Sequence, residues 1–192
     1  MRVAISQPCF LPYKGYFELI NSVDVFVFYD DVEFSRQSWQ QRNKVKWGFH
    51  DHWLTVPVKR KYKQLIKDVK ISKGKEVDDI RRTVRQFLKL DLPIIKTDSL
   101  CELNIGWIKY LCELQGIKTK FVLSSNIKNK SKDKIQKLID ICLYNNAKTY
   151  VMTAGCKSYF KEKETQLFNS QGINVEIKTF EPSYSVVNYL GR

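Results

Sequence analysis

The chain has 192 residues, of which 43% are hydrophobic and 28% charged, with a formal net charge of +13 at pH 7. This balance excludes a disordered chain, a collagen-like chain and a coiled coil. No apolar run approaches the roughly 18 residues of a membrane-spanning helix, and the first residues lack the apolar region of a secretory signal, so we expect a cytoplasmic protein.

The first part of the chain predicts strands separated by turns and one short helix. Residues 3–6 predict a strand that stops at Gln7, and residues 17–23 predict a helix after a turn-rich stretch. Residues 25–32 are nearly continuously apolar before two aspartates, which is typical of a strand covered on both faces. Residues 53–58 predict a further strand, closed by a basic loop.

The second part alternates helices and strands more clearly. Helical spacing of apolar residues predicts helices over 76–90, 99–115, 131–145 and 158–170. Short apolar runs predict strands over 120–124, 149–153 and 173–180. No linker interrupts this pattern, so we expect a single α/β domain over residues 1–192.

This alternation predicts an α/β fold, a three-layer sandwich around a largely parallel open sheet of the Rossmann-like or nucleotidyltransferase-like kind. In such sheets ligands bind beyond the carboxyl ends of the strands. The polar residues at that rim are Gln7, Asp30, Asp31, Ser124, Ser125 and residues 153–155. We expect the functional site there.

The stretch from Gln7 to Tyr16 is unusual for a connecting loop. Two prolines stiffen it and three aromatic side chains fill it. A stiff loop that leads into a helix is suited to hold an anionic or sugar ligand. The alternative is a packed aromatic loop that closes one end of the core. The stretch has neither a dinucleotide-binding glycine motif nor a P-loop.

Two clusters follow it. Asp30 and Asp31 are suited to hold a cation, to act as a general base or to bind the amine of an amino sugar, whereas the alternative is a turn with exposed acids. Trp39 offers a stacking face, Arg42 an anion clamp and Asn43 a directed amide. The alternative is a surface helix turn with its tryptophan in the core. We predict that both clusters and the Gln7 loop meet in one cleft.

The net charge, the two histidines and the cysteines indicate function less clearly than these clusters do. The positive charge comes from 25 Lys and 8 Arg spread along the chain, which favours anionic partners in general. The sequence His50-Asp51-His52 lacks a third ligand, so we expect no metal. Five scattered cysteines are expected to be mostly buried thiols. Lys157 lies where a helix is predicted to begin and would add charge for an anion.

The stretch QPCFLPYKGYFELINSVDVFVFYDDVEF, followed by SWQQRNKV and WLTVPV, resembles the WbqC-like family of bacterial proteins. The later stretches LCELQGIKTKFVLSS, NNAKTYVMTAGCKSY and SVVNYLGR are similar to that family in the same order. On the matching positions the resemblance implies site residues Gln7, Pro8, Pro12, Tyr13, Gly15, Tyr16, Asp30, Asp31, Trp39, Arg42, Asn43, Ser124, Ser125, Gly155 and Tyr159. Asp30, Asp31 and Arg42 would be catalytic and the others would bind substrate.

Members of this family are encoded among genes for O-antigen and other surface polysaccharides. The resemblance therefore implies a transferase that forms an amide between a glycyl or related acyl donor and a nucleotide-linked amino sugar. It implies no bound cofactor, and one candidate donor is a phosphopantetheine thioester on a carrier protein. Two departures from the family are Cys9, where an aromatic or small polar residue is usual, and a shorter stretch between Phe180 and Ser185.

Two other functions remain open from the sequence. The hypothesis of a nucleotidyl-transferring or adenylating enzyme rests on fold-level similarity alone. The chain lacks the motif with which such enzymes bind phosphates. The hypothesis of a basic nucleic-acid-binding protein rests on the net charge. The densest basic run, residues 59–63, carries no recognised nucleic-acid motif. We therefore expect no nucleic-acid partner.

Overall fold

A computed structural model describes residues 1–59, 61–72, 74–155 and 160–191 of the chain. The chain divides into two compact units. Unit 1 consists of Met1–Ser6, Glu18–Tyr29 and Lys118–Glu181, and unit 2 of Gln7–Phe17, Asp30–Ile117 and Pro182–Arg192. A single domain over the whole chain stays a prediction.

The two units contain different kinds of element, and helix α1 (Lys14–Asn21) begins in unit 2 and ends in unit 1. The other elements of unit 1 are β1 (Arg2–Ser6), β2 (Val25–Phe28), β7 (Lys120–Leu123), the 3-10 turn η2 (Ser124–Asn126), α4 (Lys134–Tyr144), β8 (Thr149–Thr153), α5 (Glu162–Ser170) and β9 (Asn174–Lys178). Those of unit 2 are β3 (Arg42–Trp47), β4 (His50–Thr55), β5 (Val58–Lys59), the 3-10 turn η1 (Ile66–Asp68), β6 (Lys70–Ile71), α2 (Gly74–Leu88), α3 (Leu100–Leu114) and α6 (Val187–Leu190).

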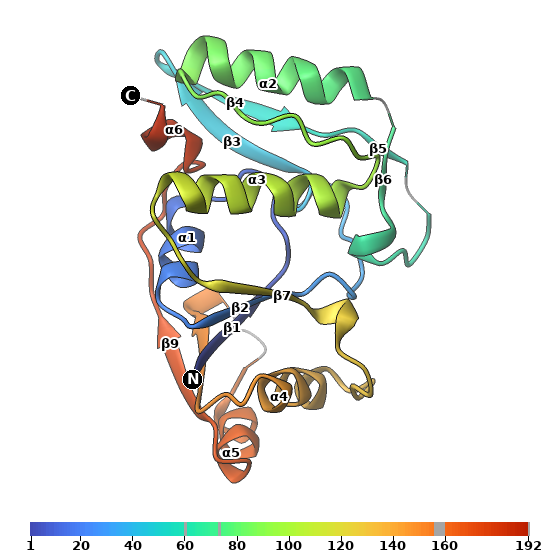
Figure 1. Cartoon of the computed structure of the whole chain (residues 1–192), viewed down its shortest axis with the longest axis vertical. Helices are drawn as coiled ribbons and strands as arrows, with labels where there is room; N and C mark the ends of the chain where they lie inside the picture. Colours follow the sequence, from blue (N-terminus) through green and yellow to red (C-terminus); the bar gives the residue numbers. More distant parts are fainter. Residues whose placement is uncertain (60, 73, 156–159, 192) are drawn as a thin grey trace. The chain divides into compact units, whose positions relative to one another are not determined.

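Unit 1 is built on a five-stranded sheet in the order β7-β2-β1-β8-β9, and all of its pairings are parallel. The chain leaves β1 toward β2 on one side and adds β8 on the other side. The crossovers place α1 on one face of the sheet and α4 and α5 on the opposite face, as Figure 1 shows. The predicted α/β fold with a central parallel sheet flanked by helices is confirmed.

The core of unit 1 follows from this layering. Val3, Val27 and Met152 face one cluster of buried residues together with side chains of α4 and α5. Within that cluster the ring of Tyr150 stacks on Phe168 of α5 with centroids 5.0 Å apart. Every residue of β2 is buried, as expected for an inner strand of a covered sheet.

Unit 2 is organised around an antiparallel hairpin of β3 and β4. Its two-residue turn begins with Gly48, whose φ of +60° suits the first position of a type II′ turn. Alternation along the strands directs Asn43, Val45 and Leu54 inward, and all three are buried. At the same face Trp47 stacks on Phe87 of α2, with ring centroids 5.0 Å apart.

The structure corrects several predicted boundaries. The strand predicted over residues 25–32 ends at Phe28, so both aspartates lie in a loop. The strand predicted over 53–58 is β4, which begins at His50, and the helix predicted over 17–23 is α1, which begins at Lys14. Strand β3 was not predicted, because three of its six residues are cations. None of the helices among the described residues is long and apolar enough to span a bilayer.

Candidate functional site

Two parts of the predicted site meet in unit 2. The side-chain amide of Gln40 donates a hydrogen bond from Nε2 to Oε1 of Gln7 over 2.8 Å. The backbone N–H of Phe10 donates to the carbonyl of Trp39, also over 2.8 Å. The loop that follows β1 is therefore fixed against the segment that precedes β3.

Asn104 of α3 holds the Gln7 loop and the segment before β3 together. Its side chain is 1% exposed, and its Nδ2 donates to the carbonyls of Pro8 at 3.0 Å and Gln40 at 2.7 Å. Its Oδ1 is buried without a hydrogen-bond partner among the described residues. Sequence reasoning missed Asn104, although a polar residue between Leu103 and Ile105 on an apolar helix is a visible signal.

The predicted binding residues of the Gln7 loop differ in accessibility. Pro8, Gly15 and Tyr16 are buried, whereas Gln7 and Tyr13 are half-buried. The hydroxyl of Tyr16 donates to the carbonyl of Gln7 over 2.9 Å, and Tyr13 forms a β-bridge with Ser185. Most of these residues therefore support the shape of the loop, as the packed-loop alternative expects, and Gln7 and Tyr13 remain partly accessible.

Asn43 has a similar supporting position. Its Nδ2 donates to the carbonyl of Leu11 over 2.6 Å, and its Oδ1 accepts from the N–H of Lys44 over 2.7 Å. The side chain is 6% exposed. Its amide therefore holds the loop to β3.

An exposed aromatic and basic surface covers the other face of the hairpin. Trp39 and Trp53 are 57% and 46% exposed, and their rings stack with centroids 5.9 Å apart. The guanidinium carbon of Arg42 lies 4.1 Å from the centroid of the Trp53 ring. The core position expected for Trp39 under the alternative interpretation is wrong, and so is the helix turn, because Arg42 begins a strand. We call Trp39, Arg42 and Trp53 the hairpin face.

Further along the hairpin a small polar network continues this surface. The ammonium of Lys44 lies 2.9 Å from Oδ2 of Asp51, and the hydroxyl of Tyr184 donates to Oδ1 of Asp51 over 2.7 Å. The hydrogen bonds from Tyr184 and Lys44 lower the pKa of the Asp51 carboxyl. Asp51 is therefore a carboxylate that orients both neighbours.

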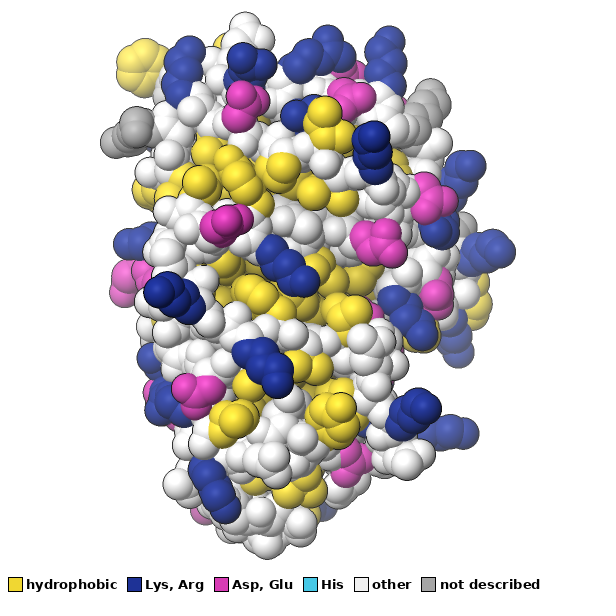
Figure 2. Space-filling model, in the orientation of Figure 1, with side chains coloured by type: hydrophobic (Ala, Val, Ile, Leu, Met, Phe, Trp, Pro, Cys, Tyr) yellow, Lys and Arg dark blue, Asp and Glu magenta, His cyan; other side chains and the backbone are white. Residues whose placement is uncertain are grey.

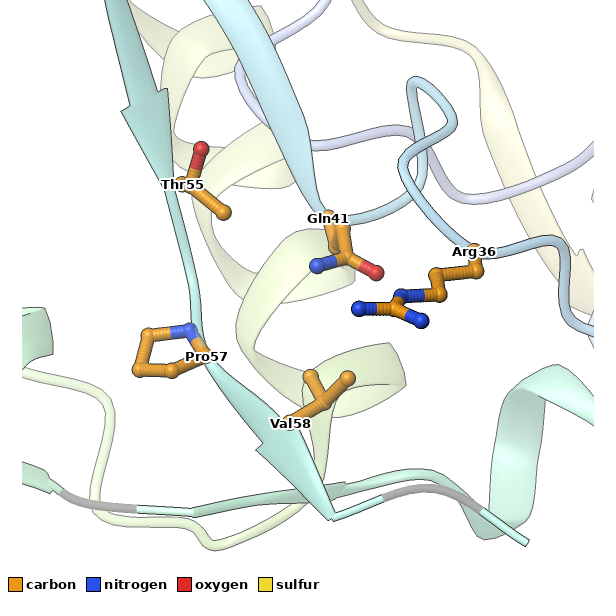
Figure 3. A pocket seen from close by; sticks show the side chains of 5 residues that line it. All are labelled: Arg36, Gln41, Thr55, Pro57 and Val58. Atoms are coloured by element: carbon orange, nitrogen blue, oxygen red, sulfur yellow. The ribbon is translucent and has the colours of Figure 1, made fainter.

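A cavity of about 420 Å³ adjoins the hairpin face (Figure 3). It is lined by Arg36, Gln41, Thr55, Pro57 and Val58, and Figure 3 shows the guanidinium of Arg36 turned toward the amide of Gln41. Because Thr55 pairs with Arg42 across the hairpin, the cavity lies next to the hairpin face.

The cavity-lining residues and Trp53 were missed by sequence reasoning. A usable signal was the alternation in WLTVPV, where Leu54 and Val56 share one face and Trp53 and Thr55 share the other. That alternation predicts an exposed tryptophan beside a polar side chain. No comparable local signal marks Arg36 or Gln41, which precede the hairpin.

The two aspartates lie after the end of β2 and differ in burial. Asp30 is 2% exposed, and its carbonyl accepts the N–H of Lys67 in η1 over 2.9 Å. Asp31 is half-buried. Of the two, Asp31 is the carboxylate that a substrate reaches more easily.

The remaining predicted residues belong to unit 1 and follow its strands at the carboxyl edge of the sheet. Ser124 is buried at the start of η2, and its carbonyl accepts the N–H of Ile127 and the ammonium of Lys130. Ser125 is half-buried, and Gly155 is exposed after β8. Lys157 and Tyr159 lie outside the described residues.

The cysteine thiols are poorly suited to act as nucleophiles. Burial raises the pKa of Cys9, Cys101 and Cys112 to about 12, and it raises the pKa of Cys142 as well. These groups are neutral thiols at pH 7. Cys101, Cys112 and Cys142 are buried as predicted, and Cys156 lies outside the described residues. In the part of the chain that the structure describes, no three His, Cys, Asp or Glu residues are grouped as a metal site.

Lysine and arginine side chains are scattered over the face of the molecule in Figure 2 and are not gathered in one patch there. The described basic groups that have aromatic partners are more informative than the net charge. Arg42 lies over Trp53, and the ammonium of Lys46 lies 5.7 Å from the ring centroid of Tyr184. Charge and stacking surface therefore coincide on the hairpin, and they also do so at Lys63 with Tyr62 and at Lys137 with Tyr29.

The chain is similar to known proteins over most of its length. Over 177 residues the chain is 28% identical to the uncharacterized protein Rv1507c of Mycobacterium tuberculosis, which covers 84% of this chain and 76% of that protein. No solved structure matches the chain. A match to the WbqC-like protein family covers residues 7–189, and the chain therefore belongs to the WbqC-like protein family.

Proposed function

We propose that the chain is a transferase that joins a glycyl or related aminoacyl group to the amine of a nucleotide-linked amino sugar during surface polysaccharide synthesis. The observation that carries this proposal is the hairpin face, on which Arg42 lies 4.1 Å from the ring of Trp53 and Trp39 stacks beside it. Membership of the WbqC-like family supports it.

The hairpin face suits the two chemical parts of such a substrate. Exposed indole rings stack on a nucleobase or on the apolar face of a sugar. A guanidinium forms paired hydrogen bonds with phosphate oxygens. The Nε of Arg42 is buried without a partner among the described residues. The guanidinium of Arg42 would hold a phosphate-bearing ligand beside the aromatic surface on which it lies.

Asp31 is the residue that we assign to the substrate amine. A half-buried carboxylate attracts an ammonium group and accepts a proton from it as the amine becomes a nucleophile. Asp30, which is buried, acts as a positioning residue for this segment through its backbone bond to η1.

The reaction needs no nucleophile from the protein, in agreement with the neutral cysteine thiols. The amine nitrogen attacks the carbonyl carbon of a thioester donor, such as a phosphopantetheine thioester on a carrier protein. The C–N bond forms and the C–S bond breaks, so the sulfur leaves with the electron pair. The proton lost by the amine passes to Asp31 and then to the departing thiolate.

Mass spectrometry of purified protein incubated with nucleotide-linked amino sugars and aminoacyl thioesters tests this proposal. We expect a new amide on the sugar. Asp31→Asn should lower turnover about 10²–10⁴-fold, because a general base is lost, while the unfolding midpoint stays unchanged.

Asp78→Asn is the matched control, since Asp78 is an exposed carboxylate on α2. It should leave turnover unchanged. Full activity of Asp31→Asn would remove the assigned proton acceptor. Release of pyrophosphate from a nucleoside triphosphate, without amide formation, would favour an adenylating enzyme.

A further inference from the structure

The cavity beside the hairpin face offers hydrogen-bond donors and no carboxylate. Its polar lining groups are the guanidinium of Arg36, the amide of Gln41 and the hydroxyl of Thr55. Pro57 and Val58 complete the lining with apolar surface. A cavity with this chemistry attracts an anion and excludes a cation.

Gln41 is the most informative of these residues. It is 7% exposed, and its Oε1 accepts the backbone N–H of Gln37 over 3.3 Å. This bond orients the amide so that Nε2 is left as a donor without an acceptor among the described residues. Gln41 lines the cavity, so Nε2 can donate to a ligand that enters it.

Arg36 and Thr55 complete the set. Both residues are exposed, and Figure 3 shows both beside Gln41. Arg42 faces the same region, because it is the cross-strand partner of Thr55. One guanidinium, one amide and one hydroxyl therefore line the cavity, and Arg42 lies at the position across the hairpin from Thr55.

The distance to the tryptophans fits a nucleotide. Trp53 and Thr55 are two residues apart on β4, so their side chains lie on the same face about 7 Å apart along the strand. One nucleotide is long enough to stack its base on the tryptophans and to place its phosphates in the cavity. A cavity of about 420 Å³ lies within the range of small-molecule sites.

We infer that this cavity is the diphosphate subsite of a nucleoside diphosphate-binding site, with the base stacked on Trp39 and Trp53. Arg36 and Arg42 would pair with the phosphate oxygens, and Gln41 and Thr55 would donate to them. The inference rests on the proposed function only for the identity of the natural ligand, since binding of a nucleoside diphosphate requires no acyl transfer.

Calorimetric titration of the full chain with UDP, pyrophosphate and uridine tests the subsite. UDP should bind, pyrophosphate should compete with it, and uridine should bind at least tenfold more weakly because it carries no phosphate. Quenching of tryptophan fluorescence should accompany the binding of UDP.

Two substitutions separate the subsite from general positive charge. Gln41→Glu keeps the shape and the acceptor for the N–H of Gln37 but replaces the donor by a negative charge, so UDP affinity should fall at least tenfold. Arg36→Ala should have a similar effect. Arg82→Ala, which removes an exposed arginine of α2, should leave affinity unchanged. Circular dichroism of each variant checks that the fold is retained.

The outcomes are distinct. Wild-type affinity of Gln41→Glu or Arg36→Ala, equal binding of UDP and uridine, or displacement of UDP by a single-stranded oligonucleotide would each overturn the subsite. Amide formation with an unchanged KM for the nucleotide sugar in Arg36→Ala would overturn it and leave the proposed function intact. Normal UDP binding with no amide product would contradict the proposed function and leave the subsite intact.

Discussion

The two units of the chain bury different kinds of side chain. In the described part of unit 1 the buried polar residues are Ser124 and Asn145. Unit 2 buries Asp30, Gln40, Gln41, Asn43, Ser99, Asn104 and Ser185. Unit 1 is a regular parallel sheet whose backbone satisfies its own hydrogen bonds, so its interior is almost entirely apolar. Unit 2 contains irregular segments whose backbone groups need side-chain partners.

The candidate site depends on the buried polar side chains of unit 2. A side-chain amide that holds a loop also fixes the residues next to it. Asn104 holds the carbonyls of Pro8 and Gln40, and these residues lie beside Gln7 and Trp39. The polar interior of unit 2 thus costs stability in exchange for a defined arrangement of accessible groups.

The largest expected effect is in the apolar core of unit 1. Phe168 is fully buried and stacks on Tyr150, so Phe168→Ala should lower the free energy of unfolding by about 3–5 kcal/mol. Chemical denaturation followed by circular dichroism measures it. Leu167→Ala is the neighbouring control, because Leu167 is 44% exposed and its loss should cost less than about 1 kcal/mol. Equal losses would contradict the assigned core.

The next effect compares one buried asparagine from each unit. Asn104→Ala leaves two carbonyls in unit 2 without a donor and should cost about 1–3 kcal/mol. Asn145→Ala removes one bond to the carbonyl of Ile141 at the end of α4 and should cost less. Denaturation curves of both variants give the comparison. A larger loss for Asn145→Ala would refute the idea that unit 2 depends more on polar contacts.

The difference between the regular unit 1 and the irregular unit 2 explains which elements could be predicted from the sequence. The parallel sheet of unit 1 was predictable, because apolar runs such as residues 149–153 and helical periodicities are local signals. Strand β8 has the predicted bounds. Strand β3 was missed because Arg42, Lys44 and Lys46 occupy its solvent face, which lowers its hydrophobicity below that of a typical strand.

The candidate site was predictable only in part. The chemistry of tryptophan and arginine, a stacking ring and an anion clamp, identified Trp39 and Arg42. The rule that ligands bind beyond the carboxyl ends of parallel strands identified Gln7 and Asp31. The contact between Gln7 and Gln40 joins residues 33 positions apart, and no local pattern encodes such a pairing. The donor set of Arg36, Gln41 and Thr55 depends on hairpin register in the same way.

A smaller effect is expected on the exposed side of unit 2. Trp53→Ala removes the stacking partner of Trp39 and the ring beneath Arg42, and should cost only about 0.5–1.5 kcal/mol of stability. UDP affinity should fall more strongly than stability does. Trp53→Phe is the conservative control and should retain part of the affinity. A loss of stability as large as that of Phe168→Ala would mean that Trp53 is a core residue.

The smallest effect concerns the polar network of the hairpin. The pKa of Asp51 is lowered first by the hydrogen bond from Tyr184 and then by the hydrogen bond from Lys44. Because folding lowers this pKa, the ionised Asp51 carboxyl stabilises the folded state at pH values above the ordinary carboxyl pKa. This stabilisation is lost as the pH falls through the lowered pKa of the folded state, here below about pH 4. Tyr184→Phe should therefore raise the pKa of Asp51, as measured by carboxyl NMR titration.

Tyr144→Phe serves as the control for this titration, because Tyr144 is an exposed tyrosine of unit 1. It should leave the pKa of Asp51 unchanged. The change in stability at neutral pH should be small in both variants, since Asp51 and its partners are exposed and solvent screens their interaction. An unchanged pKa in Tyr184→Phe would show that Lys44 alone orients Asp51, and the polar network would then be confined to the two strands of the hairpin.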